Sequence, residues 1–98
     1  MNPLKVDRNN IIKLTDLPNV GKAVAADLTL LGINNPDDLI QRDAFKLYDE
    51  LCHITQARHD PCVIDVFISV IRFMQGEPAR PWWKYTAERK QILLRLAI

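Results

Sequence analysis

The residues best suited to hold a ligand lie in one short segment, Leu14–Leu28, which reads LTDLPNVGKAVAADL. A helix N-terminus presents unpaired N–H groups and a partial positive charge, so it binds phosphate wherever no bulky side chain blocks the approach. We expect Pro18 to stiffen the entry to such a turn, Asn19 to take a left-handed conformation and Gly21 to leave the backbone open. Lys22, in the first helical turn, would add a charge-assisted contact.

These features predict a DNA-binding turn that holds the phosphate backbone. Val20 is expected to point inward and hold the turn on the core, while the small side chain of Ala23 lets helices cross closely. Residues 11–27 carry two lysines and two aspartates, a net charge of zero. Non-specific binding in the weak range, roughly 10⁻⁴ to 10⁻⁶ M, is therefore the most to expect from one copy. The candidate residues are Pro18, Asn19, Val20, Gly21, Lys22 and Ala23.

A second candidate surface is the basic, aromatic segment ARPWWKYTAERK near the C-terminus. Residues 1–79 carry 8 Lys/Arg against 11 Asp/Glu, whereas residues 80–98 carry 5 against 1, so attraction to a polyanion is expected mainly here. The aromatic rings either stack on bases or dock the segment on the core, with one tryptophan buried and the other exposed. The candidate residues are Arg80, Trp82, Trp83, Lys84, Arg89 and Lys90.

The segment CHITQARHDPC gathers thiol and imidazole groups, which zinc prefers as ligands. Cys52, His59 and Cys62 are candidates for three ligands of a tetrahedral site, but their spacing matches no common zinc frame. Packing of both cysteines as small apolar residues is favoured, with a redox-responsive pair as a further alternative. Cys62, close to a helix start, is expected to have a lowered pKa if exposed. We expect no metal and no cofactor.

Enzymatic motifs are not found in the sequence. It contains no G-x-x-x-x-G-K, no dinucleotide fingerprint, no H-E-x-x-H and no G-x-S-x-G, so we expect a non-catalytic protein without a small-molecule substrate. The first ten residues, MNPLKVDRNN, lack the apolar region of a signal peptide, and no apolar stretch is long enough to span a bilayer. We therefore expect a soluble, cytoplasmic protein without a membrane partner.

The elements that must position these residues are predicted to be helices. With 98 residues, 48% of them hydrophobic and 26% charged, the chain is typical of a single globular domain. No alternating strand pattern occurs, so the fold class is all-α. We expect about six short helices, at about Asp7–Thr15 with Ile11, Ile12 and Leu14 inward, Gly21–Leu31, from Pro36, from Asp43 to His53, Pro61–Gln75, and from Thr86 through Leu96.

Local signals mark several helix ends. Asn35, Asp43, Asp60 and Thr86 are expected to cap helix starts, and Gly32 and Gly76 to end helices. Of the fifteen residues 61–75, ten are apolar, and the polar ones form a narrow stripe. A helix that is apolar on nearly all sides belongs in a core or against a partner chain. The stripe consists of Asp65, Ser69 and Arg72.

LTDLPNVGKAVAADLTLLGI resembles a helix-hairpin-helix motif, most closely that of the C-terminal domain of competence-regulator proteins. Asn19 stands where many members have glycine, and is expected to take up space where a phosphate would approach. Together with DPCVIDVFISVIRFMQGEPARPWWKYTAERK, the segment resembles the bacterial pathogenicity-locus, or mitomycin-resistance, family over about Leu14 to Lys90. The resemblance implies one helix-hairpin-helix domain over residues 1–98, with the hairpin at about 7–32 and the basic tail at 78–98.

Three hypotheses follow. The leading one is non-catalytic, sequence-independent binding of the DNA backbone through the hairpin. The second is a protein–protein adaptor or homo-oligomer that uses the 61–75 helix and the tryptophan-containing segment. The third is a metal- or thiol-responsive regulator built on Cys52 and Cys62.

Overall fold

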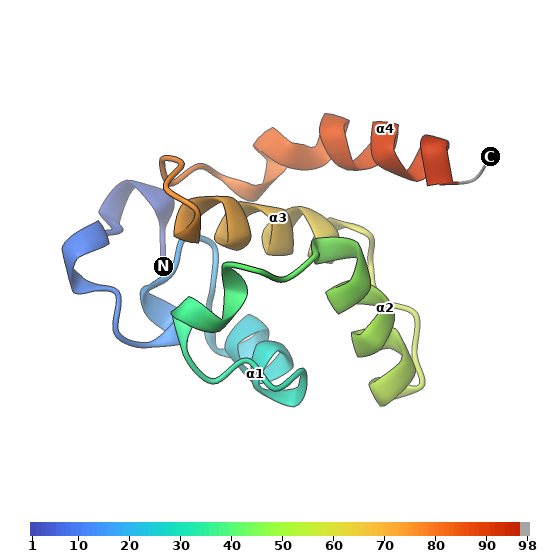
Figure 1. Ribbon diagram of the computed structural model, residues 1–98, viewed down its shortest axis with the longest axis horizontal. Coiled ribbons are helices and arrows are strands. Elements are labelled where there is room, and N and C mark those ends of the chain that lie inside the picture. The colour runs from blue at the N-terminus through green and yellow to red at the C-terminus, as the bar shows by residue number, and fades with distance from the viewer. Residues whose placement is uncertain (97–98) are drawn as a thin grey trace.

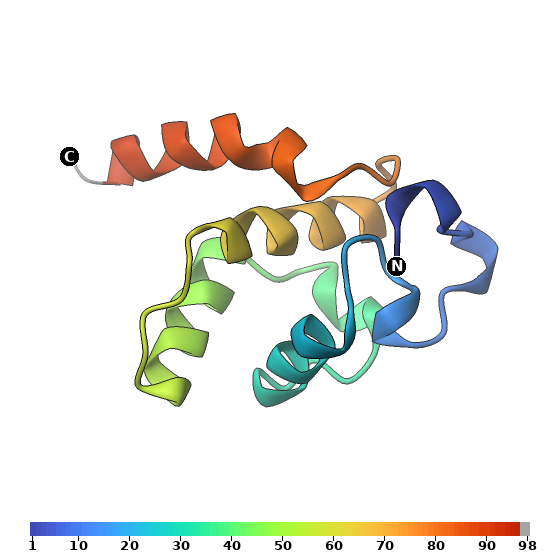
Figure 2. The same cartoon turned by 180° about the vertical axis from the view of Figure 1, so that it is seen from behind.

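Helix α3 (Cys62–Met74) runs through the middle of the molecule (Figure 1). Helices α1 (Lys22–Leu30) and α2 (Ala44–Thr55) lie on one side of it, and helix α4 (Thr86–Leu96) lies on the other. The view from behind shows the same three layers (Figure 2). The chain thus surrounds its most apolar helix with its other helices.

The computed structural model describes residues 1–96, and residues 97 and 98 of the expected tail lie outside the described residues. Within residues 1–96 the fold is all-helical, as predicted, with four α-helices and no strand. The remaining helical elements are single 3-10 turns, so the expectation of about six helices was only approximate. The 3-10 turns are η1 (Pro3–Lys5), η2 (Arg8–Asn10), η3 (Leu14–Asp16), η4 (Pro36–Leu39) and η5 (Trp82–Tyr85).

The core is a single apolar cluster to which every α-helix except α4 contributes. Phe67 of α3 and Leu28 of α1 are fully buried in it. Apolar burial of this kind stabilises a fold by about 25 cal/mol for each Å² removed from water. The core residues are Leu14, Leu17, Val20, Leu28, Leu31, Ile33, Leu39, Ala44, Leu47, Leu51, Ile64, Phe67, Ile68, Val70, Ile71, Phe73 and Tyr85.

Helix starts follow the local signals in the sequence. The Asp43 carboxylate accepts hydrogen bonds from the N–H groups of Phe45 (2.9 Å) and Lys46 (3.1 Å), which caps α2 as predicted. Asp60 accepts from the N–H of Cys62 at 2.8 Å, next to the start of α3. Thr86 is not the N-cap of α4, because it is itself the first helical residue, with φ of −61° and ψ of −44°. Its hydroxyl donates to the Asp65 carboxylate at 2.7 Å.

The prediction of a helix at about Asp7–Thr15 is wrong. Two separate 3-10 turns, η2 and η3, occupy this segment, and Ile12 is exposed. The physical reason is competition from side chains: Asp7 accepts from the N–H of Asn9, and Asp16 accepts from the N–H groups of Ile12 and Lys13. Short acidic side chains that bind nearby amides favour turns over a continuous helix.

The polar stripe of α3 is where distant segments attach. Asp65 and Ser69 are buried, and Arg72 is half-buried. Each accepts or donates hydrogen bonds to a segment outside α3, so the stripe faces other parts of the chain. A polar stripe on an otherwise apolar helix therefore marks internal docking positions here.

Among residues 1–96, no helix combines the length and the apolar character needed to cross a bilayer.

Candidate nucleic-acid interface

The hairpin turn, residues Pro18–Ala23, is fixed to the core by buried side chains. Val20 is 1% exposed, which confirms that it points inward, and Leu17 just before the turn is fully buried. Pro18 is also fully buried. Pro18 and Val20 therefore position the turn, and their side chains are not available to touch a ligand.

Asn19 adopts the predicted left-handed conformation, with φ of 66°. Its side-chain Nδ2 donates to the Ser69 Oγ of α3 (3.0 Å) and to the carbonyl of Arg80 (2.8 Å). The expectation that Asn19 takes up space where a phosphate would approach stays a prediction; around Gly21 itself, a Cβ built on the backbone meets no heavy atom within 4 Å. The amide group is used to bind the turn to α3 and to the chain before η5.

The N-terminus of α1 is open and uncapped. Gly21 is the N-cap residue, with φ of −99° and ψ of −168°, and no side chain caps the helix. The first turn of α1 contains no acidic residue, and Lys22 and Ala23 are exposed. By contrast, Asp43 caps α2 and Asp60 binds the first amide of α3. Of these three helices, α1 is the one with no carboxylate either at its N-cap or in its first turn.

The backbone donors of the turn are fewer than the sequence suggested. The N–H of Asn19 donates to the carbonyl of Met1 (2.7 Å), and that of Val20 donates to the carbonyl of Leu17 (3.4 Å). Proline has no N–H. The hydrogen bonds of the described chain leave the N–H groups of Gly21, Lys22 and Ala23 without a partner. The candidate phosphate site therefore contracts from residues 18–23 to residues 21–23.

The basic tail divides into internal and surface cations. Arg89 is 8% exposed and pairs with the fully buried Asp65, with 2.9 Å between Arg89 Nε and Asp65 Oδ1. This hydrogen bond raises the pKa of the Arg89 guanidinium. Lys84 and Lys90 are exposed, and within residues 1–96 neither forms an ion pair. Arg89 is therefore a structural residue, and the prediction that it belongs to the DNA-binding surface is wrong.

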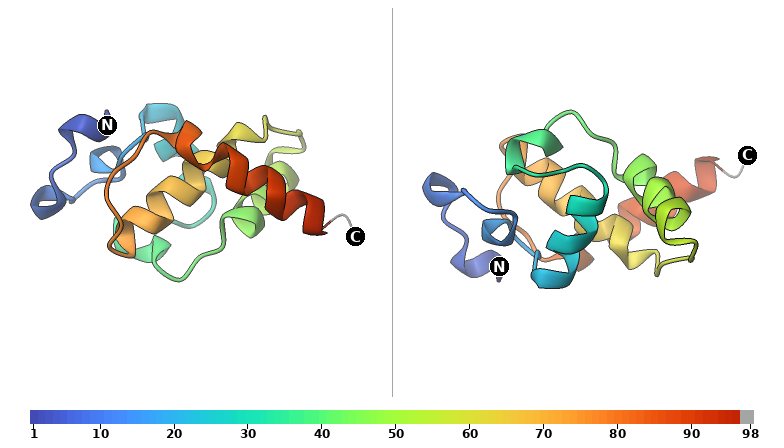
Figure 3. Two further views of the ribbon diagram at one scale, coloured as in Figure 1. Left: turned by 90° about the horizontal axis from the view of Figure 1, so that it is seen from above. Right: turned by 90° about the horizontal axis from the view of Figure 1, so that it is seen from below.

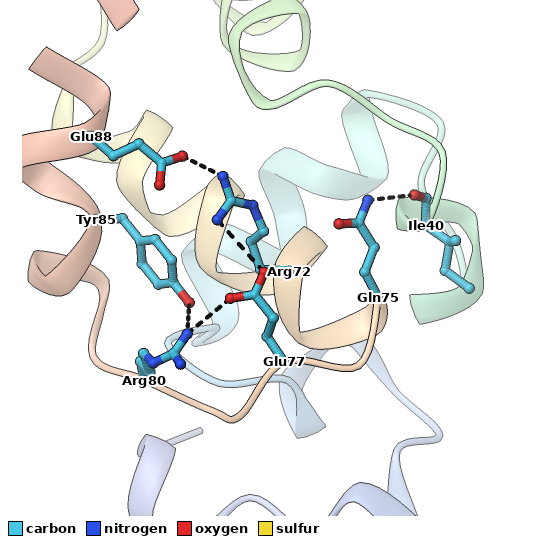
Figure 4. Close-up of polar contacts among 7 residues, drawn as sticks. All are labelled: Ile40, Arg72, Gln75, Glu77, Arg80, Tyr85 and Glu88. Atoms are coloured by element: carbon cyan, nitrogen blue, oxygen red, sulfur yellow. Dashed lines mark hydrogen bonds and ion pairs between the residues drawn. The ribbon is translucent and has the colours of Figure 1, made fainter. Parts of the chain in front are cut away.

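Arg80 is likewise held by its neighbours, as Figure 4 shows. Its guanidinium donates to the Glu77 carboxylate (3.0 Å) and to the Tyr85 hydroxyl (3.2 Å). These two hydrogen bonds raise the pKa of Arg80. Arg72 of α3 pairs with the same Glu77 and with Glu88 of α4. The positive charge that the tail presents to solvent is therefore smaller than its number of basic residues suggests, because Arg80 and Arg89 are paired with carboxylates.

The two tryptophans have the divided exposure that the sequence predicted. Trp82 is half-buried, while Trp83 is 59% exposed. Their rings meet edge to face, with centroids 5.7 Å apart and planes at 84°. The Asn19–Arg80 hydrogen bond holds the segment that precedes them next to the hairpin turn. Trp83 thus offers one aromatic surface to solvent.

The cysteine and histidine residues do not form a metal site. Within residues 1–96, no group of three or more His, Cys, Asp and Glu side chains is placed to hold a metal ion, so Cys52, His59 and Cys62 are not brought together for that purpose. Both cysteines are free and half-buried. The pKa of Cys62 is raised, because the thiol donates a hydrogen bond to Asp60 and is partly desolvated. A lowered pKa was expected only for an exposed thiol, and Cys62 is half-buried. The His59 ring lies 2.8 Å from the Thr55 hydroxyl.

Comparison with known proteins assigns the family. The model of the Cdd1 family, described as "Pathogenicity locus", matches residues 7–91. The chain is 42% identical over 80 residues to "Mitomycin resistance protein McrB" of Streptomyces lavendulae, which covers 82% of this chain and 76% of that protein. The chain belongs to the pathogenicity locus family. No solved structure matches it. The family resemblance inferred from sequence is thereby confirmed.

In this pathogenicity locus family chain, the matched residues contain the hairpin turn and both members of the Asp65–Arg89 pair. They also contain α3, which was one candidate protein interface. That prediction is wrong for α3, because Phe67, Val70 and most of its other residues are buried within the same chain. Sequence reasoning missed Asp65 and Ser69 as attachment points, although both lie on the polar stripe at helical spacing.

Proposed function

We propose that this chain binds the phosphate backbone of DNA without sequence preference and without catalysis. One observation carries the proposal: the N-terminus of α1 is exposed, uncapped and free of acidic residues, behind a rigid turn. Aligned N–H groups at such a terminus bind an anion through hydrogen bonds and through the helix dipole. Gly21, which has open space around its Cα, lets a phosphate reach the backbone.

The supporting charges are few, so the proposed binding is weak. Lys22 is exposed in the first turn of α1, and Lys84 and Lys90 are exposed in the C-terminal segment. A protein that neutralises few phosphates binds DNA non-specifically with a Kd of roughly 10⁻⁴ to 10⁻⁶ M at physiological salt. Phosphate contacts fix position but read no bases, which gives the absence of sequence preference. DNA is thus the proposed partner, with neither a membrane nor a small-molecule substrate.

The deciding experiment measures DNA affinity by fluorescence anisotropy for the unmodified chain and for Gly21→Asp. Aspartate is a preferred N-cap residue and fits the backbone conformation of Gly21, so this variant should be at least as stable as the parent. Its carboxylate would occupy the same amides and repel phosphate. We expect binding to weaken by about tenfold or more, which corresponds to about 1.4 kcal/mol. Gly21→Ser, which caps without adding charge, should weaken it less.

The matched control is Gln41→Glu, which adds one negative charge at an exposed position in the turn before α2. It should leave affinity within about twofold, because the added carboxylate caps none of the α1 amides and an exposed charge is screened by salt. Each measurement is repeated at two salt concentrations, and affinity should fall as salt rises. Equal binding by Gly21→Asp and the parent protein, or binding that ignores salt, would contradict the proposal.

The name of the relative suggests a cellular test of the same proposal. McrB of Streptomyces lavendulae is named for mitomycin resistance. If this chain acts similarly through its hairpin, its expression should raise the survival of a sensitive bacterium exposed to mitomycin, and Gly21→Asp should abolish the gain. Protection that is equal for both proteins would separate resistance from the hairpin.

A further inference from the structure

Trp83 of η5 exposes an aromatic ring that the core does not use. The residue is 59% exposed, whereas Tyr85 of the same turn is 5% exposed and belongs to the apolar core. The ring of the half-buried Trp82 meets that of Trp83 edge to face, which restricts how the exposed ring can move. An indole ring that is held by a neighbour and still faces water is suited to stack on a flat ligand.

The chain on both sides of Trp83 is attached to the rest of the fold. Before it, the carbonyl of Arg80 accepts a hydrogen bond from Asn19 Nδ2 in the hairpin turn (2.8 Å). After it, the Thr86 hydroxyl donates to the buried carboxylate of Asp65 in α3 (2.7 Å). A side chain on a segment that is already ordered loses less conformational entropy when it binds a ligand, so Trp83 is preorganised for contact.

The hydrogen bond to Asn19 also places Trp83 near the candidate phosphate site. Three residues of chain span at most about 11 Å, so the Cα of Trp83 lies within that distance of the Cα of Arg80. Seen from above, the chain passes over the hairpin turn on its way into η5 and α4 (Figure 3). A strand bound at the N-terminus of α1 therefore has the Trp83 ring in its vicinity.

The charge next to the ring is positive. Lys84 is exposed and, within residues 1–96, forms no ion pair. The carboxylates of Glu77 and Glu88, which bond to this segment, are paired with Arg80 and Arg72. These three cations and two carboxylates leave one positive charge, and Lys84 is the unpaired member.

We propose that the Trp83 ring stacks on an unpaired base of a DNA strand whose phosphates contact Lys84 and the N-terminus of α1. This inference rests on the proposed function and names the form of DNA that the site takes. Every base has a flat π-face, so stacking on an aromatic side chain selects unpaired bases without reading their sequence.

Stacking on Trp83 requires a base whose face is open. In a duplex, neighbouring base pairs cover one another, and taking a base out of the stack costs free energy. Phosphate contacts alone favour the duplex, because its charge density is higher. Tighter binding of single-stranded than of duplex DNA therefore distinguishes stacking on Trp83 from binding of the backbone alone.

The first test compares two labelled DNA probes by fluorescence anisotropy. One is an oligonucleotide of about 12 thymidines, within the usual site size of single-strand binding proteins, and the other is a duplex of equal length. We expect the unmodified chain to bind the single strand more tightly than the duplex. Trp83→Ala should weaken single-strand binding about tenfold and leave duplex binding within about twofold, because the duplex offers no open base face.

The matched control is Leu94→Ala, which shortens another exposed apolar side chain, 69% exposed on α4. It should leave both affinities within about twofold, because it removes no stacking surface. Trp83→Phe, which retains a smaller ring, should lose less single-strand affinity than Trp83→Ala. Circular dichroism should show all three variants folded.

Intrinsic fluorescence gives a second measurement of the stacking. The thymidine oligonucleotide should quench the tryptophan emission of the parent protein, since a base in stacking contact quenches an indole ring. Trp83→Phe should remove most of this quenching, and Trp82, which remains in that variant, serves as the internal reference.

Three results would overturn the inference: a parent protein that binds the duplex as tightly as the single strand, single-strand binding that Trp83→Ala leaves unchanged, or an equal loss of affinity for both probes in Trp83→Ala. If Gly21→Asp still weakens duplex binding in these cases, the proposed function stands without stacking on Trp83. Failure of the parent protein to bind either probe would contradict both the inference and the proposed function.

Discussion

The hairpin turn and the C-terminal segment differ in how they use charge. The hairpin region, residues 11–27, has a net charge of zero, yet it exposes Lys22 beside an uncapped helix terminus. Residues 80–98 carry five basic residues, yet Arg89 neutralises the buried Asp65 and Arg80 is bonded to Glu77. The number of basic residues in a segment therefore does not measure the charge available to a ligand. The neutral segment is therefore the better candidate for an anion site, while two of the five basic residues of the C-terminal segment are bonded to side chains of the same chain.

The largest expected effect comes from Arg89, on the structural side of this comparison. Arg89→Met would leave the carboxylate of Asp65 buried without its charge partner, and breaking such a pair costs about 3–5 kcal/mol in the free energy of unfolding. Urea denaturation measures the loss. Lys90→Met, at the next residue on the exposed face, should change stability by no more than about 0.5 kcal/mol. Equal losses of stability from the two substitutions would contradict the view that Arg89 is structural and Lys90 is a surface cation.

A smaller effect is expected at Asn19, where the two regions meet. Asn19→Ala removes both side-chain hydrogen bonds and places alanine at φ of 66°, which should destabilise the fold by about 1–3 kcal/mol. Asn19→Gly keeps the conformation accessible and loses only the hydrogen bonds, so its loss should be smaller. Thermal unfolding compares the two. If Asn19→Gly lowers stability as much as Asn19→Ala, the left-handed backbone at this position adds nothing to the cost of the alanine substitution.

Next in size is the expected contrast between the exposed lysines. Lys22→Gln should weaken DNA binding a few-fold at every sequence and reduce the slope of log K against log salt by about 1. Lys84→Gln tests the C-terminal segment by the same measurement. A larger effect at Lys84 than at Lys22 would move the main DNA contact from the hairpin turn to the segment around η5.

The smallest expected effect is a pH dependence of the free energy of unfolding that comes from Asp16, which precedes the hairpin turn. Hydrogen bonds from the backbone N–H groups of Lys13 and Ile12 lower the pKa of Asp16 below its usual 3.8. Because the folded pKa is the lower one, this stabilisation is complete above about pH 4 and is lost as the pH falls through the folded pKa. Unfolding followed from pH 5 to pH 3 should show a shallower decline for Asp16→Asn. An identical decline in stability for the parent protein and Asp16→Asn would contradict the role of Asp16 in this pH dependence.

What the sequence predicted correctly was local. The all-helical class, the caps at Asp43 and Asp60 and the left-handed Asn19 depend on residues within a few positions of one another. What it missed depends on distant pairing. Arg89 was assigned to a DNA surface because its partner, Asp65, lies 24 residues earlier and gives no signal near the tail. The open N-terminus of α1 was predicted, but the loss of two amide donors to Met1 and Leu17 was not.

The side chain of Asn19 also has a consequence for the order of folding. Its two hydrogen bonds reach across 50 and 61 residues of sequence, to Ser69 and Arg80. Contacts of such long range form late, because closing a long loop costs entropy before the contact returns any stability. During synthesis, both of these side-chain hydrogen bonds can form only after residue 80 has left the ribosome. A nascent chain therefore lacks the attachment of this turn to Ser69 and Arg80 until most of the protein has been made.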